Sequence, residues 1–295
     1  MAREHAGVVS DAEADDFLRA RLPIGDLLVL ADEAPAPLPR AQALADAAVV
    51  LTQAGEHRFA AETLVRASDL CREARAPAPD TAQLRALLAG IEQELKSSAP
   101  RVTAWPREVL LFTGHMMDAP GRGEPRFPPA LEPVAVRELG AALDRLGAGP
   151  QDLALCQAAA GGDLLFLEAC QRRGVRCQVL LPFDEAAFIE RSVRPSIQGE
   201  QWVARFHAVT AGLRDPVRVM PDALGPGPEG IDPFERCNLW LLCTALACGA
   251  HRVRLVALWN GGGGDGPGGT RHLHDEVKRR SGQVTWLDAR RWQAP

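Results

Sequence analysis

Two patterns of apolar positions divide the chain. From Asp16 to about Leu95, apolar residues recur at steps of three and four positions, which places them on one face of successive amphipathic helices. After a Ser-, Ala- and Pro-containing linker at residues 97–106, apolar runs of strand length alternate with helical stretches instead. The sequence therefore predicts a helical domain over residues 1–100 and an α/β domain over residues 101–295.

Proline clusters divide the helical part into short helices. Because proline removes a backbone donor and clashes with the preceding turn, the clusters at 34–39 and 76–79 are expected to end helices. The expected segments are a polar, frayed stretch over residues 1–16, a first helix from Asp16 to the cluster at 34–39, and helices over residues 40–54, 57–75 and 81–96. Two short helices joined at Gly55 resemble one tetratricopeptide-like hairpin, while a plain bundle or a cap on the second domain fits equally well. We expect residues 16–96 to contact a protein partner or a second copy of the chain.

The second pattern predicts an α/β fold with a doubly wound, mostly parallel, Rossmann-like sheet after the N-terminal all-helical segment. The expected strands are residues 108–113, 152–158, 176–182, 217–220, 252–259 and 283–287. The expected helices between them are residues 130–146, 163–173, 201–213, 233–248 and 270–280. Several strands are almost continuously apolar, which is typical of a parallel sheet covered by helices on both faces. The pattern does not fix the order of the strands.

Composition narrows the classes of function. The net charge of −5 argues against a protein whose main role is to bind nucleic acid. There is no Tyr, and Lys96 and Lys278 are the only lysines, so the sequence contains neither a phenol nor a P-loop lysine for chemistry. The seven cysteines stand in apolar or helical stretches without a CxxC pair. We expect free, buried thiols, no metal site and no cofactor.

The N-terminus and the longest apolar run determine the expected location. Residues 1–16 are acidic and polar, unlike a secretory signal. The longest apolar run, residues 239–250, is too short to cross a bilayer. We therefore expect a cytoplasmic protein with no membrane association.

Three glycine-bearing loops follow predicted strands, and ligands of open parallel sheets bind at the carboxyl ends of strands. The first loop contains Thr113, Gly114 and His115. Glycine lets the backbone approach a ligand closely, and the two neighbouring side chains are suited to a phosphate, a ribose or a base. A strand-end turn with a packed or solvated histidine would have the same sequence.

The second loop places Gly161 and Gly162 directly before a predicted helix. Free N–H groups at the start of a helix, together with the helix dipole, favour an anion. Asp163 is suited to hold a ribose hydroxyl, and the simpler alternative is that it only caps the helix.

The third loop, residues 260–270, is the most glycine-rich part of the chain. A flexible linker has a similar composition, but a strand and a helix flank this run directly, which favours a phosphate-binding turn. The candidate ligand-binding residues in this loop are Asn260, Gly266, Gly268, Gly269 and Thr270. Asp265 is a candidate for binding a hydroxyl or a metal, or for catalysis.

Two further features give weaker signals. Residues 188–195 are expected to form a loop after the third strand, and they contain Arg191 and Ser192. An arginine there can bind phosphate, although ordinary solvated charge is the commoner role. Asn238 lies inside an apolar helical stretch, where it either reaches the site or is a satisfied core amide.

Together the three loops resemble the SLOG superfamily of Rossmann-like domains, which includes the LOG phosphoribohydrolases and the DprA-like proteins. The resemblance covers about residues 107–290. Residues 113–115 are similar to a TGH motif after the first strand, residues 161–169 to the second loop and helix, and residues 266–270 to a later P-G-G-x-G-T loop. The resemblance implies binding of a nucleotide or nucleotide-derived ligand at these loops. It also implies a sensing role, in some members within bacterial signalling or defence.

One departure from the family pattern separates the functional hypotheses. The hydrolytic members carry a Glu three residues after the loop Thr, and here that position is Leu273. The absence of that Glu favours a module that binds or senses a nucleotide-like small molecule. No nucleic acid is expected as a partner. The alternative is a hydrolase that cleaves the N-glycosidic bond of a nucleotide, with Asp163 or Asp265 as the catalytic residue. A third possibility is a scaffold built on an inactive nucleotide fold.

Overall fold

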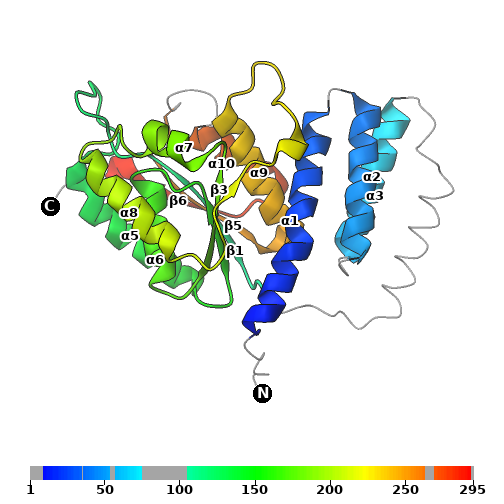
Figure 1. The fold of residues 1–295 in the computed structure, drawn as a ribbon, viewed down its shortest axis with the longest axis horizontal. Helices are drawn as coiled ribbons and strands as arrows, with labels where there is room; N and C mark the ends of the chain where they lie inside the picture. The colour runs from blue at the N-terminus through cyan, green and yellow to red at the C-terminus, as the bar shows by residue number, and fades with distance from the viewer. Residues whose placement is uncertain (1–8, 35, 54–56, 75–104, 263–268, 294–295) are drawn as a thin grey trace. The chain divides into compact units, whose positions relative to one another are not determined.

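The computed structural model describes residues 9–34, 36–53, 57–74, 105–262 and 269–293 (Figure 1). The chain forms two compact units. The first is built from residues 1–104 and 246–249, and the second from residues 105–245 and 250–295. Helices make up the described part of the first unit, and the second contains the sheet.

The helices of the first unit are α1 (Asp11–Glu33), α2 (Pro37–Gln53) and α3 (His57–Glu73). Helix α2 packs against both α1 and α3. Leu44, Leu51 and Leu64 are fully buried between helices, so the apolar stripe seen in the sequence forms a core. The predicted N-terminal helical segment is confirmed. The expected turn at Gly55 and the expected helix over residues 81–96 lie outside the described residues.

Two helices begin earlier than expected. Helix α1 begins at Asp11, inside the stretch expected to be frayed, because Ser10 and Glu13 form a reciprocal cap. The Ser10 hydroxyl accepts a hydrogen bond from Glu13 N at 3.4 Å, and the Glu13 carboxylate accepts one from Ser10 N at 2.8 Å. Helix α2 begins at Pro37, since the fixed φ and missing N–H of proline are tolerated in the first turn.

The second unit is built on a parallel sheet with helices on both faces. Its strands are β1 (Val109–Gly114), β2 (Leu153–Cys156), β3 (Arg176–Leu181), β4 (Arg218–Val219), β5 (Val253–Trp259) and β6 (Val284–Asp288). Its α-helices are α5 (Glu132–Leu146), α6 (Gly162–Gln171), α7 (Glu185–Ser192), α8 (Gly199–Ala211), α9 (Pro233–Ala247) and α10 (Thr270–Arg280). Short 3-10 helices occur at Pro129–Leu131, Asp222–Leu224, Ala250–Arg252 and Ala289–Arg291.

The strand order is β4-β3-β2-β1-β5-β6, and every neighbouring pair is parallel. From β1 the chain builds the sheet outward to β4, with α5, α6 and α8 on one face (Figure 1). It then returns through α9 to β5 beside β1 and continues through α10 to β6, with α9 and α10 on the other face. This confirms the predicted doubly wound, Rossmann-like fold. The direction of winding reverses between β1 and β5, and ligands of such sheets bind beside that point.

The segment expected to be a loop after the third strand is instead helix α7. Asp184 caps it, because its carboxylate accepts a hydrogen bond from Ala187 N at 2.9 Å. Phe188 and Ile189 are buried on its inner side. Arg191 and Ser192 therefore lie in the last turn of a helix, and the expectation of a loop at these residues was wrong. A helix of only two turns gives too short a periodic pattern to distinguish it from a loop.

The backbone before α6 lies very close to the backbone after β1. Gly162 N donates a hydrogen bond to His115 O, and Met117 N donates one to Ala160 O, both at 3.0 Å. Gly161 has a φ of +95°, and a Cβ placed on it would lie 2.5 Å from Met117 N. Only glycine permits both this backbone conformation and this approach.

Replacing Gly161 by Ala is therefore expected to lower the free energy of unfolding by about 2 kcal/mol or more, since the new Cβ cannot be accommodated without moving the β1 loop. Gly123→Ala is the control, because nothing lies within 4 Å of a Cβ at that position. Urea unfolding of both variants measures the difference. Equal stability of the two variants would contradict the close packing described above.

Candidate functional site

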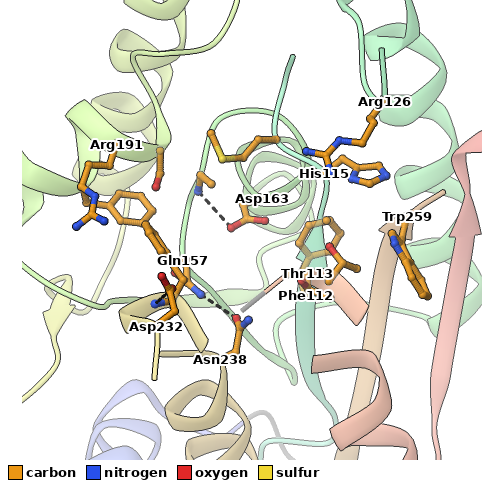
Figure 2. Close-up of a pocket in the computed structure, with 18 residues that line it drawn as sticks. Phe112, Thr113, His115, Arg126, Gln157, Asp163, Arg191, Asp232, Asn238 and Trp259 are labelled. Carbon is orange, nitrogen blue, oxygen red and sulfur yellow. Dashed lines mark hydrogen bonds between the residues drawn. The ribbon is translucent and has the colours of Figure 1, made fainter. Parts of the chain in front are cut away.

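A cavity of about 300 Å³ opens at the carboxyl ends of β1, β2 and β5, which is the point where the winding of the sheet reverses (Figure 2). Residues from the ends of these strands, from the first turns of α6, α9 and α10, and from α7 line it. This is the position at which open α/β sheets bind ligands, and the volume is at the lower end of the range for small-molecule sites. The three predicted loops contribute to one cavity.

The loop after β1 contributes Thr113, Gly114 and His115 to the cavity wall. The His115 ring is buried, and its Nε2 accepts a hydrogen bond from Asn260 N at 3.0 Å. The pKa of His115 is lowered to about 4, chiefly because the ring is buried and secondly because of the positive charge of Arg126. At neutral pH the ring is therefore uncharged, with one nitrogen already bonded to the protein. It ties the β1 loop to the β5 loop and is a poor candidate for a general base.

The first turn of α6 contributes Asp163 to the cavity, whereas Gly161 and Gly162 lie behind the surface and support it. The expectation that Gly162 offers a free N–H group does not hold, because that group donates to His115 O. The Gly162 amide thus joins two loops and is not available to an anion.

Asp163 is a buried carboxyl group inside the cavity (Figure 2). Its Oδ2 accepts a hydrogen bond from Ala159 N at 3.2 Å. Burial raises the pKa of Asp163 to about 7, although hydrogen bonds from backbone N–H groups oppose the rise. Within the described residues it forms no ion pair with a cation. Near neutral pH this carboxyl therefore exists in both its protonated and its ionised form.

The loop after β5 contributes Gly269 and Thr270 to the cavity. Asn260 lies beside the cavity, where its Oδ1 accepts a hydrogen bond from Gly262 N at 2.9 Å and closes a turn. The other candidates in this loop are outside the described residues, namely Asp265, Gly266 and Gly268. The structure therefore describes only the two ends of the predicted phosphate-binding turn.

Helix α7 contributes Arg191 and Ser192. The Arg191 guanidinium lies over the rings of Phe183 and Phe234, 4.7 Å and 5.5 Å from their centroids. Such cation–π contacts hold the guanidinium but leave its N–H groups without acceptors. Among the described residues, Arg191 has no hydrogen bond or ion pair.

Sequence reasoning missed several residues that line the cavity. Arg126 lies between β1 and α5 in a stretch with no periodic pattern, and no sequence signal marks it. Its backbone is positioned by Asp118, whose carboxylate accepts hydrogen bonds from Arg126 N and Phe127 N at 3.0 Å. Gln157 and Trp259 lie at strand ends, and their position after a strand was a usable signal.

The floor of the cavity contains an amide pair. Gln157 Nε2 donates a hydrogen bond to Asn238 Oδ1 at 2.8 Å, which joins the end of β2 to α9 (Figure 2). Asn238, whose role the sequence left open, lines the cavity. Beside it, the Asp232 carboxylate accepts a hydrogen bond from Phe234 N at 2.8 Å and caps the start of α9.

The described lining of the cavity contains charged and hydrogen-bonding side chains but no evident nucleophile. Its described lining includes neither Cys nor Lys. Cys156 lies behind Asp163, and burial raises the pKa of its thiol well above the ordinary value. Within the described residues, no three His, Cys, Asp or Glu side chains are grouped so as to hold a metal ion. No helix in the described segments is long and apolar enough to span a bilayer.

A scan against protein-family models, a search of curated proteins and a search of solved structures each gave no match. The resemblance to the SLOG superfamily therefore depends on the motif residues themselves. Residues 113–115 and Asp163 line the cavity, and Gly161 and Gly162 support it. Three of the five residues of the last motif, 266–268, are outside the described residues.

Replacing Asp163 by Asn is expected to make the protein more stable than its parent above about pH 7 and to change little near pH 4. The folded state binds the proton of Asp163 more tightly than the unfolded state, where the carboxyl has its ordinary pKa of 3.8. The stabilisation that the protonated Asp163 carboxyl gives the folded state is fully present below pH 3.8 and is lost as the pH rises to about 7. The loss is about 4 kcal/mol, at about 1.4 kcal/mol per pKa unit.

Urea unfolding of the parent protein and Asp163→Asn between about pH 4 and pH 8 measures this difference. The gap between the two proteins should widen as the pH rises. A gap that stays constant with pH would show that Asp163 does not titrate as described.

Proposed function

We propose that this protein binds a nucleotide or nucleotide-derived ligand in the cavity between the ends of β1 and β5. The observation that carries the proposal is the meeting of three loops at the reversal point of the sheet, around a cavity that combines aromatic rings, guanidinium groups and hydrogen-bonding side chains. A nucleotide needs all three, because its base is flat and apolar on its faces, its sugar carries hydroxyls and its phosphates are anionic.

The lining residues divide in a way that suits the parts of a nucleotide. The rings of Trp259 and Phe234 offer apolar surface on which a base can stack. Thr113 and Ser192 supply hydroxyls, and the ionised Asp163 carboxyl can accept a hydrogen bond from a ribose hydroxyl.

Binding without turnover is the form of this proposal that the site supports best. The histidine of the cavity is uncharged and already bonded through Nε2, and the described lining contains no Cys or Lys. We propose that the α/β unit senses the ligand and that the helical unit contacts a protein partner. The signalling or defence role implied by the resemblance belongs to this proposal.

Thermal shift and calorimetry on the full chain test this function. The compounds are nucleotides, nicotinamide-dinucleotide derivatives and cyclic nucleotides. A ligand at one hundred times its Kd is expected to add about 2.7 kcal/mol to the free energy of unfolding. Thr113→Val keeps the shape of the side chain and removes its hydroxyl, so it should weaken binding by about tenfold. Thr210→Val on α8 is the matched control, since Thr210 bonds only within its own helix turn.

Failure of every compound to stabilise the protein would refute the proposed function. Stabilisation that Thr113→Val leaves unchanged would place the ligand at another site.

One observation favours a second candidate, hydrolysis of the N-glycosidic bond of a nucleotide. Asp163 has a pKa of about 7 inside the cavity, and an acid–base catalyst works best when its pKa is near the working pH. In such a reaction water adds to the anomeric carbon of the sugar, the bond to the base breaks, and Asp163 gives a proton to the departing base. The attacking water loses one proton as its oxygen becomes the new sugar hydroxyl, and that proton restores the protonated Asp163 carboxyl. Leu273 in place of the glutamate of hydrolytic relatives argues in the other direction.

Release of free base from the compounds that bind is the measurement for this second function. If Asp163 acts in turnover, Asp163→Asn should lower the rate by at least about a hundredfold and keep binding within severalfold. The rate of the parent protein should change steeply near pH 7. Absence of any free base from bound nucleotides would eliminate hydrolysis and leave the binding function in place.

A further inference from the structure

Arg191 is a cation of the cavity wall that aromatic rings hold in place. It lies in the last turn of α7, and its guanidinium carbon is 4.7 Å from the centroid of the Phe183 ring and 5.5 Å from that of Phe234. The two rings meet edge to face, with centroids 5.5 Å apart, and both also contact the buried ring of Phe188. The guanidinium therefore lies on a packed aromatic surface.

The N–H groups of Arg191 are available to a ligand. In the described part of the chain Arg191 forms no hydrogen bond and no ion pair. The two acids of the described lining bond to backbone amides instead, since Asp163 accepts from Ala159 N and Asp232 accepts from Phe234 N. A guanidinium presents five N–H donors in one plane, and two of them match a pair of oxygens on one anion.

Ser192 follows Arg191 in the chain and adds a second hydrogen-bonding group. The residue is only 2% exposed, and it lines the cavity. Its carbonyl accepts a hydrogen bond from Ala160 N at 2.9 Å, which attaches the end of α7 to the turn before α6. Among the residues that the structure describes, no group bonds to its hydroxyl. A buried hydroxyl without a partner costs free energy, and a ligand oxygen in the cavity would supply that partner.

These two residues lie on one side of the cavity. Helix α7 follows β3, Trp259 ends β5, and β2 and β1 lie between those two strands. Figure 2 accordingly shows Arg191 and Trp259 on opposite sides, with Asp163 between them. A ligand that contacts both sides extends across the carboxyl ends of β2 and β1.

We propose that Arg191 and Ser192 bind a phosphoryl group of the ligand at the α7 side of the cavity. This rests on the proposed function and specifies its ligand class as a nucleoside monophosphate. Two phosphoryl oxygens match the guanidinium and a third can accept from the hydroxyl, whereas a carboxylate has only two oxygens. The cavity of about 300 Å³ suits one compact nucleotide. The loop after β5 begins beside Trp259, so the phosphoryl group lies on the side opposite the glycine-rich loop.

Calorimetry on the full chain tests this inference with adenosine, guanosine, cytidine, uridine and their 5′-monophosphates. At least one monophosphate should bind about tenfold or more tightly than its nucleoside, since the guanidinium–phosphate contact is charge-assisted. Arg191→Gln should remove that advantage and leave the affinity for the nucleoside unchanged. Arg191→Lys should restore only part of it, because lysine keeps the charge but not the two parallel N–H groups. Ser192→Ala should weaken the monophosphate alone, by about severalfold.

Arg172→Gln is the matched control, because Arg172 is exposed at the end of α6, its side chain has no acceptor among the described residues, and it is not part of the cavity. Thr113→Val serves as a contrast, since it should weaken a nucleoside and its monophosphate by the same factor. Thermal unfolding of each variant checks that it is folded.

Three results would overturn the assignment of the phosphoryl group while nucleotide binding stands. The first is a monophosphate that binds no more tightly than its nucleoside. The second is an Arg191→Gln variant that weakens both probes equally, or neither of them. The third is binding by other nucleotides or dinucleotides of the wider panel but by none of these probes. If no compound of either set binds, the assignment and the proposed function both fail.

Discussion

The position of the cavity depends on two backbone hydrogen bonds between the segment after β1 and the turn before α6. They join Gly162 N to His115 O and Met117 N to Ala160 O. Both bonds require a turn without a side chain at Gly161. A third bond, from Asn260 N to His115 Nε2, attaches the β5 loop to the same segment. Three loops that are far apart in the sequence are thereby fixed to one another.

This arrangement uses within the protein a backbone amide that the sequence suggested for ligand binding. In many nucleotide-binding sheets the N–H groups of a glycine-rich helix start bind phosphate directly. Here the amide of Gly162 is used within the protein. Arg126 and Arg191 also line the cavity, and they are positioned by a carboxylate and by aromatic rings respectively. No glycine motif would reveal either residue.

The sequence predicted the fold well because periodicity is a local property. The strands and most helices of the α/β unit follow from apolar runs, although β4 is only Arg218–Val219 and α7 was expected to be a loop. The strand-end rule located Thr113, His115 and Asp163 near the cavity. Arg126 could not be found, because its place depends on a contact with Asp118, eight residues earlier in the same irregular loop, and has no periodic signal. The roles of Gly161 and Gly162 depend on three-dimensional packing, which a motif does not specify.

The bond between His115 and Asn260 also fixes the tautomer of the imidazole. Because Nε2 accepts from a backbone amide, the ring proton of the neutral histidine resides on Nδ1. His115 can then act toward its surroundings only as a donor through that atom. Any ligand atom that reaches Nδ1 must therefore be a hydrogen-bond acceptor, such as a phosphate oxygen or an unprotonated ring nitrogen. The hydrogen bond that links the β1 loop to the β5 loop thus also determines which kind of ligand atom can bind beside His115.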